Sequence, residues 1–187
     1  MTAAPQPWTE VYDTFYPTQT RARDILERHS RSVADLALEI NRHSGLGLPE
    51  DEVETAAMLH DIGIFLTDAP SISCFGSQPY LLHGVLGADL LRRHGFGENI
   101  ARVAERHTGA GITAAEIASW HMPFPKGRTL CPQSDLEQLV CYADKFYSKS
   151  GDMRRKPLDR VRASLARFGP DTLARFEALH ARFAFDS

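Results

Sequence analysis

Six side chains of the types that hold transition metals occur at wide intervals along this sequence. They are four histidines and two aspartates: His29, His60, Asp61, His83, His107 and Asp144. Neutral imidazoles and carboxylates are ligands for divalent first-row metals. This set is large enough to hold two metal ions around a shared oxygen ligand. The sequence therefore predicts a metal centre assembled from distant parts of the chain.

Most of these residues also have an ordinary structural explanation when each is taken alone. His29 and His107 fall at expected helix ends, where imidazole is common, and His83 lies in an apolar stretch that suits a core histidine. Asp144 is harder to explain, because a carboxylate in an apolar helix is costly unless it is paired or coordinated. The other histidines have polar or terminal settings and are treated as background: His43, His94, His121 and His180.

Helical patterns must position the six side chains. Apolar residues recur every three or four positions after His29, which indicates a helix that follows a short amphipathic one over about 20–28. Pro49 and the acids after it begin a helix that ends near Gly63. Capping boxes at Thr113–Glu116 and Ser134–Glu137 begin two more. The remaining helices are expected over about 81–94, 98–107, 155–168 and 170–184.

Two segments lack this periodicity. Residues 64–80 contain two prolines and a glycine and are predicted to form a long ordered loop, and residues 120–133 form a second loop. With no credible strands and 187 residues, an all-α single domain is expected. We divide it into an N-terminal lead over 1–19 and a helical domain over 20–187. The ligand-bearing core of that domain covers about 25–150, and C-terminal helices cover about 155–184.

Composition and charge narrow the class of protein. No apolar run approaches the roughly 18 residues of a membrane span, and no secretory signal is visible, so we expect no membrane partner. Three cysteines without a Cys-x-x-Cys pattern favour a reduced, cytoplasmic setting. Residues 1–144 carry 11 Lys/Arg against 19 Asp/Glu, which makes nucleic-acid binding an unlikely main role. Residues 145–187 carry 10 against 5, and Lys145 and Lys149 add positive potential beside Asp144 for an anionic substrate.

The order His, His-Asp, His, His, Asp resembles the HD-domain superfamily of metal-dependent enzymes over about residues 25–150. The run from Ala57 to Gly63, AMLHDIG, resembles its HDIG subgroup. The resemblance implies a helical bundle with a central metal site. It places one metal between His29, His60 and Asp144 and a second between His83 and His107, with Asp61 bridging the two. Fe or Mn is favoured for these divalent ions, and Zn, Co and Ni stay open.

Most members of the superfamily are phosphohydrolases, so the resemblance implies hydrolysis of a phosphoester of a small metabolite or nucleotide by a metal-activated water. Asp61 is then catalytic through the metals it bridges. Arg106 and Lys145 adjoin ligands and are candidates to stabilise charge on the substrate, although neighbours on a helix point about 100° apart. The 64–80 loop offers four candidate substrate contacts: Asp68, Cys74, Gln78 and Tyr80. Cys74 equally suits a buried apolar position.

Two other functions compete with hydrolysis. Some superfamily members with the same ligands are di-iron oxygenases that cleave a C–P or C–C bond, and the ligands alone do not separate the two reactions. A scaffold or sensor role is less favoured, because such members typically lose ligands. The chain lacks the Gly-Tyr-Pro signature of cyclic-dinucleotide phosphodiesterases. It has Phe65-Leu-Thr-Asp68 where alarmone hydrolases carry a Glu-Asp pair. Substrate identity and oligomeric state are not readable from the sequence.

Overall fold

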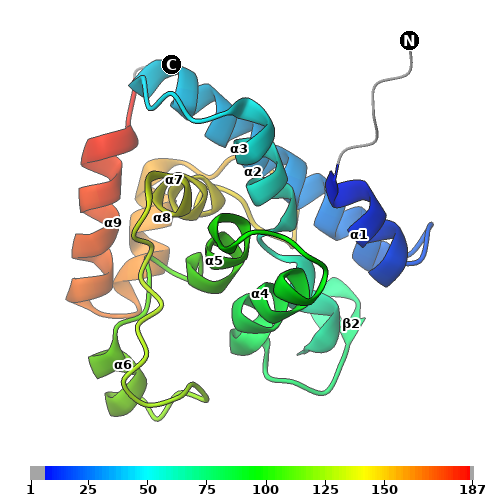
Figure 1. The fold of residues 1–187 in the computed structure, drawn as a ribbon. Coiled ribbons are helices and arrows are strands. Elements are labelled where there is room, and N and C mark those ends of the chain that lie inside the picture. Colours follow the sequence, from blue (N-terminus) through cyan, green and yellow to red (C-terminus); the bar gives the residue numbers. More distant parts are fainter. Residues whose placement is uncertain (1–6, 186–187) are drawn as a thin grey trace.

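Helices make up most of the computed structural model, which describes residues 7–185 (Figure 1). The helices are α1 Pro7–Phe15, α2 Arg21–Ser44, α3 Glu50–Leu59, α4 His83–Arg93, α5 Glu98–Arg106, α6 Ala114–Ser119, α7 Asp135–Asp144, α8 Leu158–Ala166 and α9 Pro170–Phe183. Two strands of two residues, β1 Asp68–Ala69 and β2 Cys74–Phe75, pair antiparallel between α3 and α4. The expected all-α single-domain fold is confirmed.

Helix α7 runs through the middle of the bundle, packed against α2, α3, α5 and α9. Its apolar residues are almost fully buried, including Leu139, Val140 and Ala143. Figure 1 shows α9 on one side of this centre and α1 on the opposite side. Burial of these apolar faces is the main stabilising contribution. The same packing brings the ends of several helices together, which matters for the site below. Among the described residues, no helix is long and apolar enough to cross a membrane.

Helix α2 is one continuous helix, so the predicted division at His29 is wrong. The Thr20 side chain caps it by accepting the Arg23 backbone N–H at 3.3 Å, and Gly45 ends it in the left-handed conformation at φ 65°. No glycine or proline interrupts the sequence between these two residues. His29 therefore lies inside a rigid helix rather than at its start.

The N-terminal segment predicted to be a polar lead contains helix α1. Val11 and Tyr12 of this helix, and Tyr16 just after it, are buried against the bundle. Their burial gives α1 an apolar face that a short sequence window does not reveal. The part of the lead before residue 7 lies outside the described residues.

The 64–80 segment is ordered as predicted but is not an irregular loop. It contains a β1–β2 hairpin whose strands are joined by the 3₁₀ turn Pro70–Ile72, and the 3₁₀ turns Ile62–Leu66 and Tyr80–Leu82 lie before and after the hairpin. The strands were not predicted because two-residue strands carry no alternating pattern. This compact arrangement holds the start of α4 close to the end of α3.

One of the two predicted capping boxes is complete. Thr113 accepts the Glu116 backbone N–H, and the Glu116 carboxylate accepts the Thr113 backbone N–H in return. At the other site Ser134 caps α7 by accepting the Glu137 N–H. The Glu137 carboxylate, however, accepts the N–H of Gln133 at 2.8 Å. Helix α8 begins later than predicted, at Leu158, because Pro157 occupies its cap position.

Candidate metal centre

The six predicted ligands come from five helices that meet in the interior, one from within a helix and five from helix ends. His29 lies in α2, and His60 and Asp61 follow α3 directly. The other three lie at helix ends: His83 begins α4, His107 follows α5, and Asp144 ends α7. Every one of them is buried, from 0% exposed for Asp61 to 8% for Asp144. Water therefore does not screen the charges gathered here. Buried charges of this kind are costly unless they are paired with opposite charges or coordinate a metal.

The first half of the cluster contains His29, His60, Asp61 and Asp144, whose ligand atoms lie within metal-binding reach of one another. His29 Nε2 lies 3.0 Å from Asp144 Oδ1 and 3.2 Å from Asp61 Oδ2. His60 Nε2 lies 3.0 Å from Asp61 Oδ2 and 3.5 Å from Asp144 Oδ1. Two imidazoles and two carboxylates thus face one small volume.

The second half contains His83, His107 and the same Asp61. His83 Nε2 and His107 Nε2 each lie 3.3 Å from Asp61 Oδ1 and 3.0 Å from each other. Asp61 therefore presents Oδ2 to the first half and Oδ1 to the second. This arrangement suits a carboxylate shared by two neighbouring metal ions.

Backbone carbonyls orient three of the four imidazoles. The Nδ1 atoms of His60, His83 and His107 lie 2.6, 2.7 and 2.8 Å from the carbonyl oxygens three residues earlier in the chain. A carbonyl only accepts hydrogen bonds, so each Nδ1 carries the proton and donates it. Each Nε2 of the neutral ring is then left with a lone pair directed into the cluster, which is how metal-binding histidines are held.

This arrangement fits a cation and is unfavourable with only protein atoms. The lone pairs of His83 Nε2 and His107 Nε2 face each other and the same carboxylate oxygen. Among the described buried atoms, His60 Nε2 and Asp61 Oδ1 have no hydrogen-bond partner. Unsatisfied acceptors in a buried site are costly, and a shared divalent ion removes that cost. Nitrogen and oxygen donors without thiolate are typical of Fe, Mn, Co, Ni or Zn sites.

The ionisation of the cluster is compatible with metal binding. Burial lowers the pKa of His107 to about 4, so this imidazole is neutral at pH 7. Burial raises the pKa of Asp61, but the charges of His60 and Lys149 outweigh it and hold that pKa well below its ordinary value. Asp144 is held ionised in the same way, chiefly by Lys145. Burial lowers the pKa of His60, but the charge of Asp61 and the hydrogen bond with Asp144 outweigh it and raise that pKa to about 9. A metal ion bound here would therefore displace the proton of His60 Nε2, because neutral imidazoles and ionised carboxylates are the forms that bind metals.

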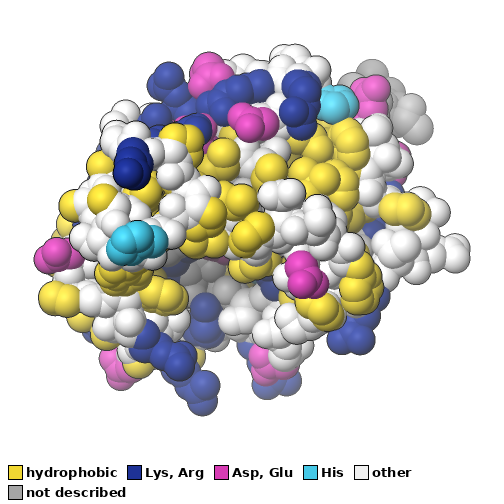
Figure 2. All heavy atoms as spheres, turned by 90° about the horizontal axis from the view of Figure 1, so that it is seen from below, with side chains coloured by type: hydrophobic (Ala, Val, Ile, Leu, Met, Phe, Trp, Pro, Cys, Tyr) yellow, Lys and Arg dark blue, Asp and Glu magenta, His cyan; other side chains and the backbone are white. Residues whose placement is uncertain are grey.

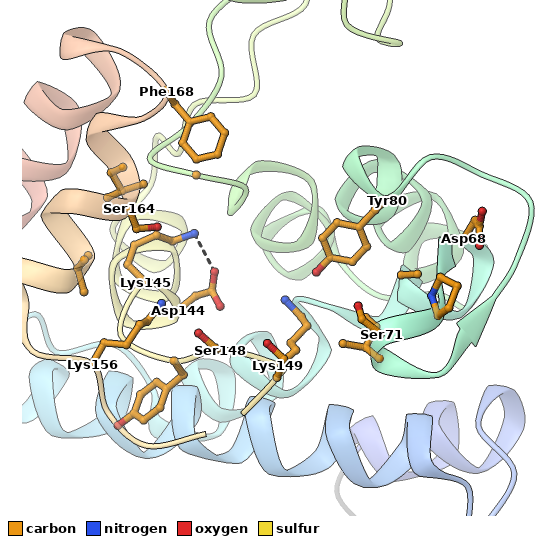
Figure 3. Close-up of a pocket in the computed structure, with 18 residues that line it drawn as sticks. Asp68, Ser71, Tyr80, Asp144, Lys145, Ser148, Lys149, Lys156, Ser164 and Phe168 are labelled. Carbon is orange, nitrogen blue, oxygen red and sulfur yellow. Dashed lines mark ion pairs between the residues drawn. The ribbon is translucent and has the colours of Figure 1, made fainter. Parts of the chain in front are cut away.

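Two lysines connect the cluster to an open cavity. Lys149 Nζ lies 2.6 Å from Asp61 Oδ2, and Lys145 Nζ lies 2.7 Å from Asp144 Oδ2. The cavity, about 620 Å³ in volume, is lined by both lysines, Asp144 and Tyr80. In Figure 3 Lys145, Lys149 and Tyr80 point into this space from different elements. We call it the lysine cavity.

The other predicted site residues divide into those that reach the lysine cavity and those that do not. Asp68, Tyr80 and Lys145 line it. Arg106 does not line it, and its guanidinium pairs with Glu137 at 3.0 Å and Glu105 at 3.4 Å. The predicted contact between Arg106 and a substrate is therefore wrong, because the Arg106 side chain pairs with Glu137 and links α5 to α7.

Two further candidates also lie away from the cavity. The Cys74 side chain is buried at 2% exposure, and burial raises the pKa of its thiol to about 11. Cys74 is thus an apolar packing residue, which was its alternative interpretation. The Gln78 side chain is exposed beyond the hairpin, and its backbone bonds to Asp68 and Leu66.

Sequence reasoning missed several residues that line the lysine cavity. Ser148, Lys156, Ser164 and Phe168 were not singled out, and Lys149 was considered only for its charge. Ser148, Lys149 and Lys156 lie in the segment between α7 and α8, whereas Ser164 lies in α8 and Phe168 follows that helix. No helical periodicity connects these residues to Asp144, so spacing alone could not place them.

The part of the chain that is similar to a known protein family is the part that carries the metal centre. The HD domain family model matches residues 26–148, which include all six residues of the cluster. The chain belongs to the HD domain family. No solved structure matches it.

Three curated proteins are similar to much of this chain. A tRNA (cytidine(56)-2'-O)-methyltransferase of Thermoplasma volcanium is 33% identical over 135 residues, 72% of this chain and 35% of the relative. A protein of the same name from Picrophilus torridus is 30% identical over 139 residues, 73% of this chain and 36% of the relative. An uncharacterized protein of Methanocaldococcus jannaschii is 34% identical over 121 residues, 63% of both chains. The chain thus spans about a third of the two methyltransferases and less than two thirds of the third relative.

Proposed function

We propose that this protein is a metal-dependent phosphohydrolase of the HDIG subgroup, with two divalent metal ions held by the six-residue cluster. It hydrolyses a phosphoester of a small metabolite or nucleotide. The observation that carries this proposal is the division of Asp61, whose Oδ2 faces His29 and His60 while Oδ1 faces His83 and His107. Such a carboxylate supports a dinuclear site, in which metal ions lower the pKa of a water and stabilise charge on a phosphoryl group.

The residues of the chain supply the rest of the reaction. The ammonium group of Lys149 lies beside Asp61 at the edge of the lysine cavity, where it can hold a phosphate oxygen. Lys145 pairs with Asp144 and donates a hydrogen bond to the His107 carbonyl at 2.9 Å, which fixes two ligand-bearing segments relative to each other. Tyr80 stacks on His83, with ring centroids 4.6 Å apart, and shields that ligand from the cavity.

The electrostatics of the lysine cavity favour an anionic substrate. Burial lowers the pKa of Lys149, but the charge of Asp61 outweighs it and raises that pKa above its ordinary value. Lys149 is therefore a fixed positive charge at neutral pH. Together with Lys145 and Lys156 it gives the wall a positive character suited to a phosphate group.

The methyl transfer named for two of the relatives is not part of this proposal. The matched region is about a third of each of those proteins, and the described part of this chain offers a buried histidine–aspartate cluster beside a basic cavity. These features support hydrolysis of a phosphorylated small molecule.

The test is phosphate release from a panel of small phosphate esters by protein reconstituted with Mn²⁺ or, anaerobically, with Fe²⁺. We expect metal-dependent turnover that a His60→Ala variant loses by at least about a hundredfold. Oxygen uptake is followed in parallel. Oxygen consumption coupled to C–P or C–C cleavage, without phosphate ester hydrolysis, would contradict the proposal in favour of a di-iron oxygenase.

A further inference from the structure

A second cavity, about 500 Å³ in volume, adjoins the lysine cavity and has a different chemical character. Its apolar lining comes chiefly from Leu81, Ile112, Trp120, Met122 and Phe168. We call it the apolar cavity. We propose that it binds the uncharged, apolar body of the substrate whose phosphate lies in the lysine cavity, so that the substrate is a phosphate ester of an aromatic or other apolar alcohol. This inference rests on the proposed phosphohydrolase function.

The two cavities lie side by side, and each has a candidate metal ligand in its wall. Both are lined by Tyr80, Gly109 and Phe168. His83, one of the candidate ligands, also lines the apolar cavity. A molecule whose phosphate faces Lys149 can therefore extend its other end past Tyr80 into the apolar cavity.

Three polar side chains of the apolar cavity, Glu116, Thr172 and His83, are already engaged with protein partners. The Glu116 carboxylate accepts hydrogen bonds from the Thr113 N–H at 2.7 Å and from Arg175 at 2.8 Å. The Thr172 hydroxyl lies 3.3 Å from the same carboxylate, and His83 Nδ1 donates to the Tyr80 carbonyl. A molecule rich in hydroxyl groups would lose its hydration here without gaining equivalent partners. An apolar group has no hydrogen bonds with water to lose when it enters this cavity.

Two large aromatic side chains that line this cavity are exposed to solvent, although burial of aromatic surface is favourable. Trp120 is 50% and Phe168 51% exposed, although both have neighbours that line the cavity. Figure 2 shows hydrophobic side chains gathered over the middle of the face seen from below, next to a hollow with basic side chains at its margin. Covering such aromatic surface with an apolar ligand is favourable, and Met122 can adapt its shape to the ligand.

Two readouts test the inference, one of binding and one of turnover. The binding readout is the fluorescence of Trp120 in a Trp8→Phe background, which leaves Trp120 as the single tryptophan of the chain. The probes are benzylphosphonate and 2,3-dihydroxypropylphosphonate, which carry no hydrolysable ester and are titrated anaerobically. We expect benzylphosphonate to shift the Trp120 emission and to bind about tenfold or more tightly than the hydroxylated probe.

The turnover readout compares phenyl phosphate with glycerol phosphate in the metal-loaded protein. Wild type is expected to prefer phenyl phosphate in kcat/KM by about tenfold or more. Trp120→Ala and Met122→Ser should each remove most of this preference, with melting curves that show the variants folded. Phe75→Ala is the matched control, because Phe75 is an exposed aromatic residue at 77% exposure that lines neither cavity.

The outcomes separate the inference from the function on which it rests. Hydrolysis of both esters at similar rates, with no Trp120 shift, would overturn the inference and leave the phosphohydrolase intact. Tight binding of benzylphosphonate without hydrolysis of any ester would uphold the apolar cavity as a ligand site and contradict the phosphohydrolase. Equal effects of Phe75→Ala and Trp120→Ala would also overturn the inference.

Discussion

The Tyr12 hydroxyl donates a hydrogen bond of 2.5 Å to the carbonyl oxygen of Met58, two residues before His60. Tyr16 donates a second one, of 2.8 Å, to the carbonyl of Ile62, directly after Asp61. Both tyrosines are fully or almost fully buried, and burial raises the pKa of each above its ordinary value, so both remain donors. Helix α1 and Tyr16 just after it therefore hold the backbone on both sides of the His60–Asp61 pair.

Removing one of these hydroxyls should destabilise the fold and loosen the metal centre. Tyr12→Phe leaves a buried carbonyl without its donor, which is expected to lower the free energy of unfolding by about 1–3 kcal/mol. Metal affinity should fall several-fold. Urea denaturation and metal titration measure the two effects. Thr14→Ala, at an exposed position of the same helix, is the control and should change neither quantity appreciably. Unchanged metal affinity in Tyr12→Phe would show that α1 has no positioning role.

Gly63 permits the closest approach between the His60–Asp61 segment and α4. A Cβ atom at this position would lie 2.3 Å from the His83 carbonyl oxygen and 2.5 Å from the Gly87 nitrogen. Gly63→Ala must therefore push α4 and its ligand His83 away, at a cost of about 1–3 kcal/mol or more. Gly87→Ala is the matched comparison, because its nearest contact would be a milder 3.1 Å. Thermal melts should show the larger loss for Gly63→Ala, and equal losses would contradict this account.

Lys149 should affect substrate binding more than metal binding. Lys149→Gln removes the charge that faces the lysine cavity, and KM for a phosphate ester is expected to rise about tenfold or more. The metal content should not fall, because the lysine competes with cations for Asp61 Oδ2. Lys126→Gln, at an exposed position outside the cavity, is the control. If Lys149→Gln lost its metal, and the metal-loaded variant had the KM of wild type, the proposed role in substrate binding would be contradicted.

The bond between Glu116 and Arg175 should give a pH-dependent stability. Burial raises the pKa of Glu116, but the Thr113 N–H and Arg175 outweigh it, so the folded pKa lies below the ordinary 4.5. A depressed carboxyl pKa contributes stability above about pH 4.5, and that stability is lost as the pH falls through the folded pKa. Glu116→Gln should be less stable than wild type by about 1–2 kcal/mol at pH 7. In urea melts this difference should shrink below pH 4.5, and a difference independent of pH would contradict the ion pair.

Much of the candidate site could be predicted because its residues have few other reasons to occur where they do. Asp144 lies in an otherwise apolar helix, and His60 and Asp61 directly follow another one. Helix ends bring such residues together once the apolar faces are buried. Helical periodicity therefore predicted most of the helices, and the resemblance to the HD-domain superfamily implied the two groups that share Asp61.

The other parts of the fold and the site could not be predicted, because they depend on contacts between distant parts of the chain that leave no periodic pattern in the sequence. Tyr12 and Tyr16 become core residues only because their hydroxyls find carbonyls beside the metal centre. Lys149 reaches Asp61 through a non-helical segment after α7, so its closeness to Asp144 in the sequence indicated a positive charge near the site but not the contact with Asp61. Arg106 was misplaced for the opposite reason, since adjacency to a ligand put it on another face of its helix, against Glu137.

If Asp61 joins two metal sites, its removal must change how many ions the protein holds, which metal stoichiometry measures. Wild type, His107→Ala and Asp61→Ala are loaded with Mn²⁺, freed of loosely bound ions and measured by elemental analysis, with melting curves to show that each is folded. The account predicts about two ions per chain in wild type, about one in His107→Ala and nearly none in Asp61→Ala. Retention of both ions in Asp61→Ala, or a wild-type protein that never binds more than one, would contradict it.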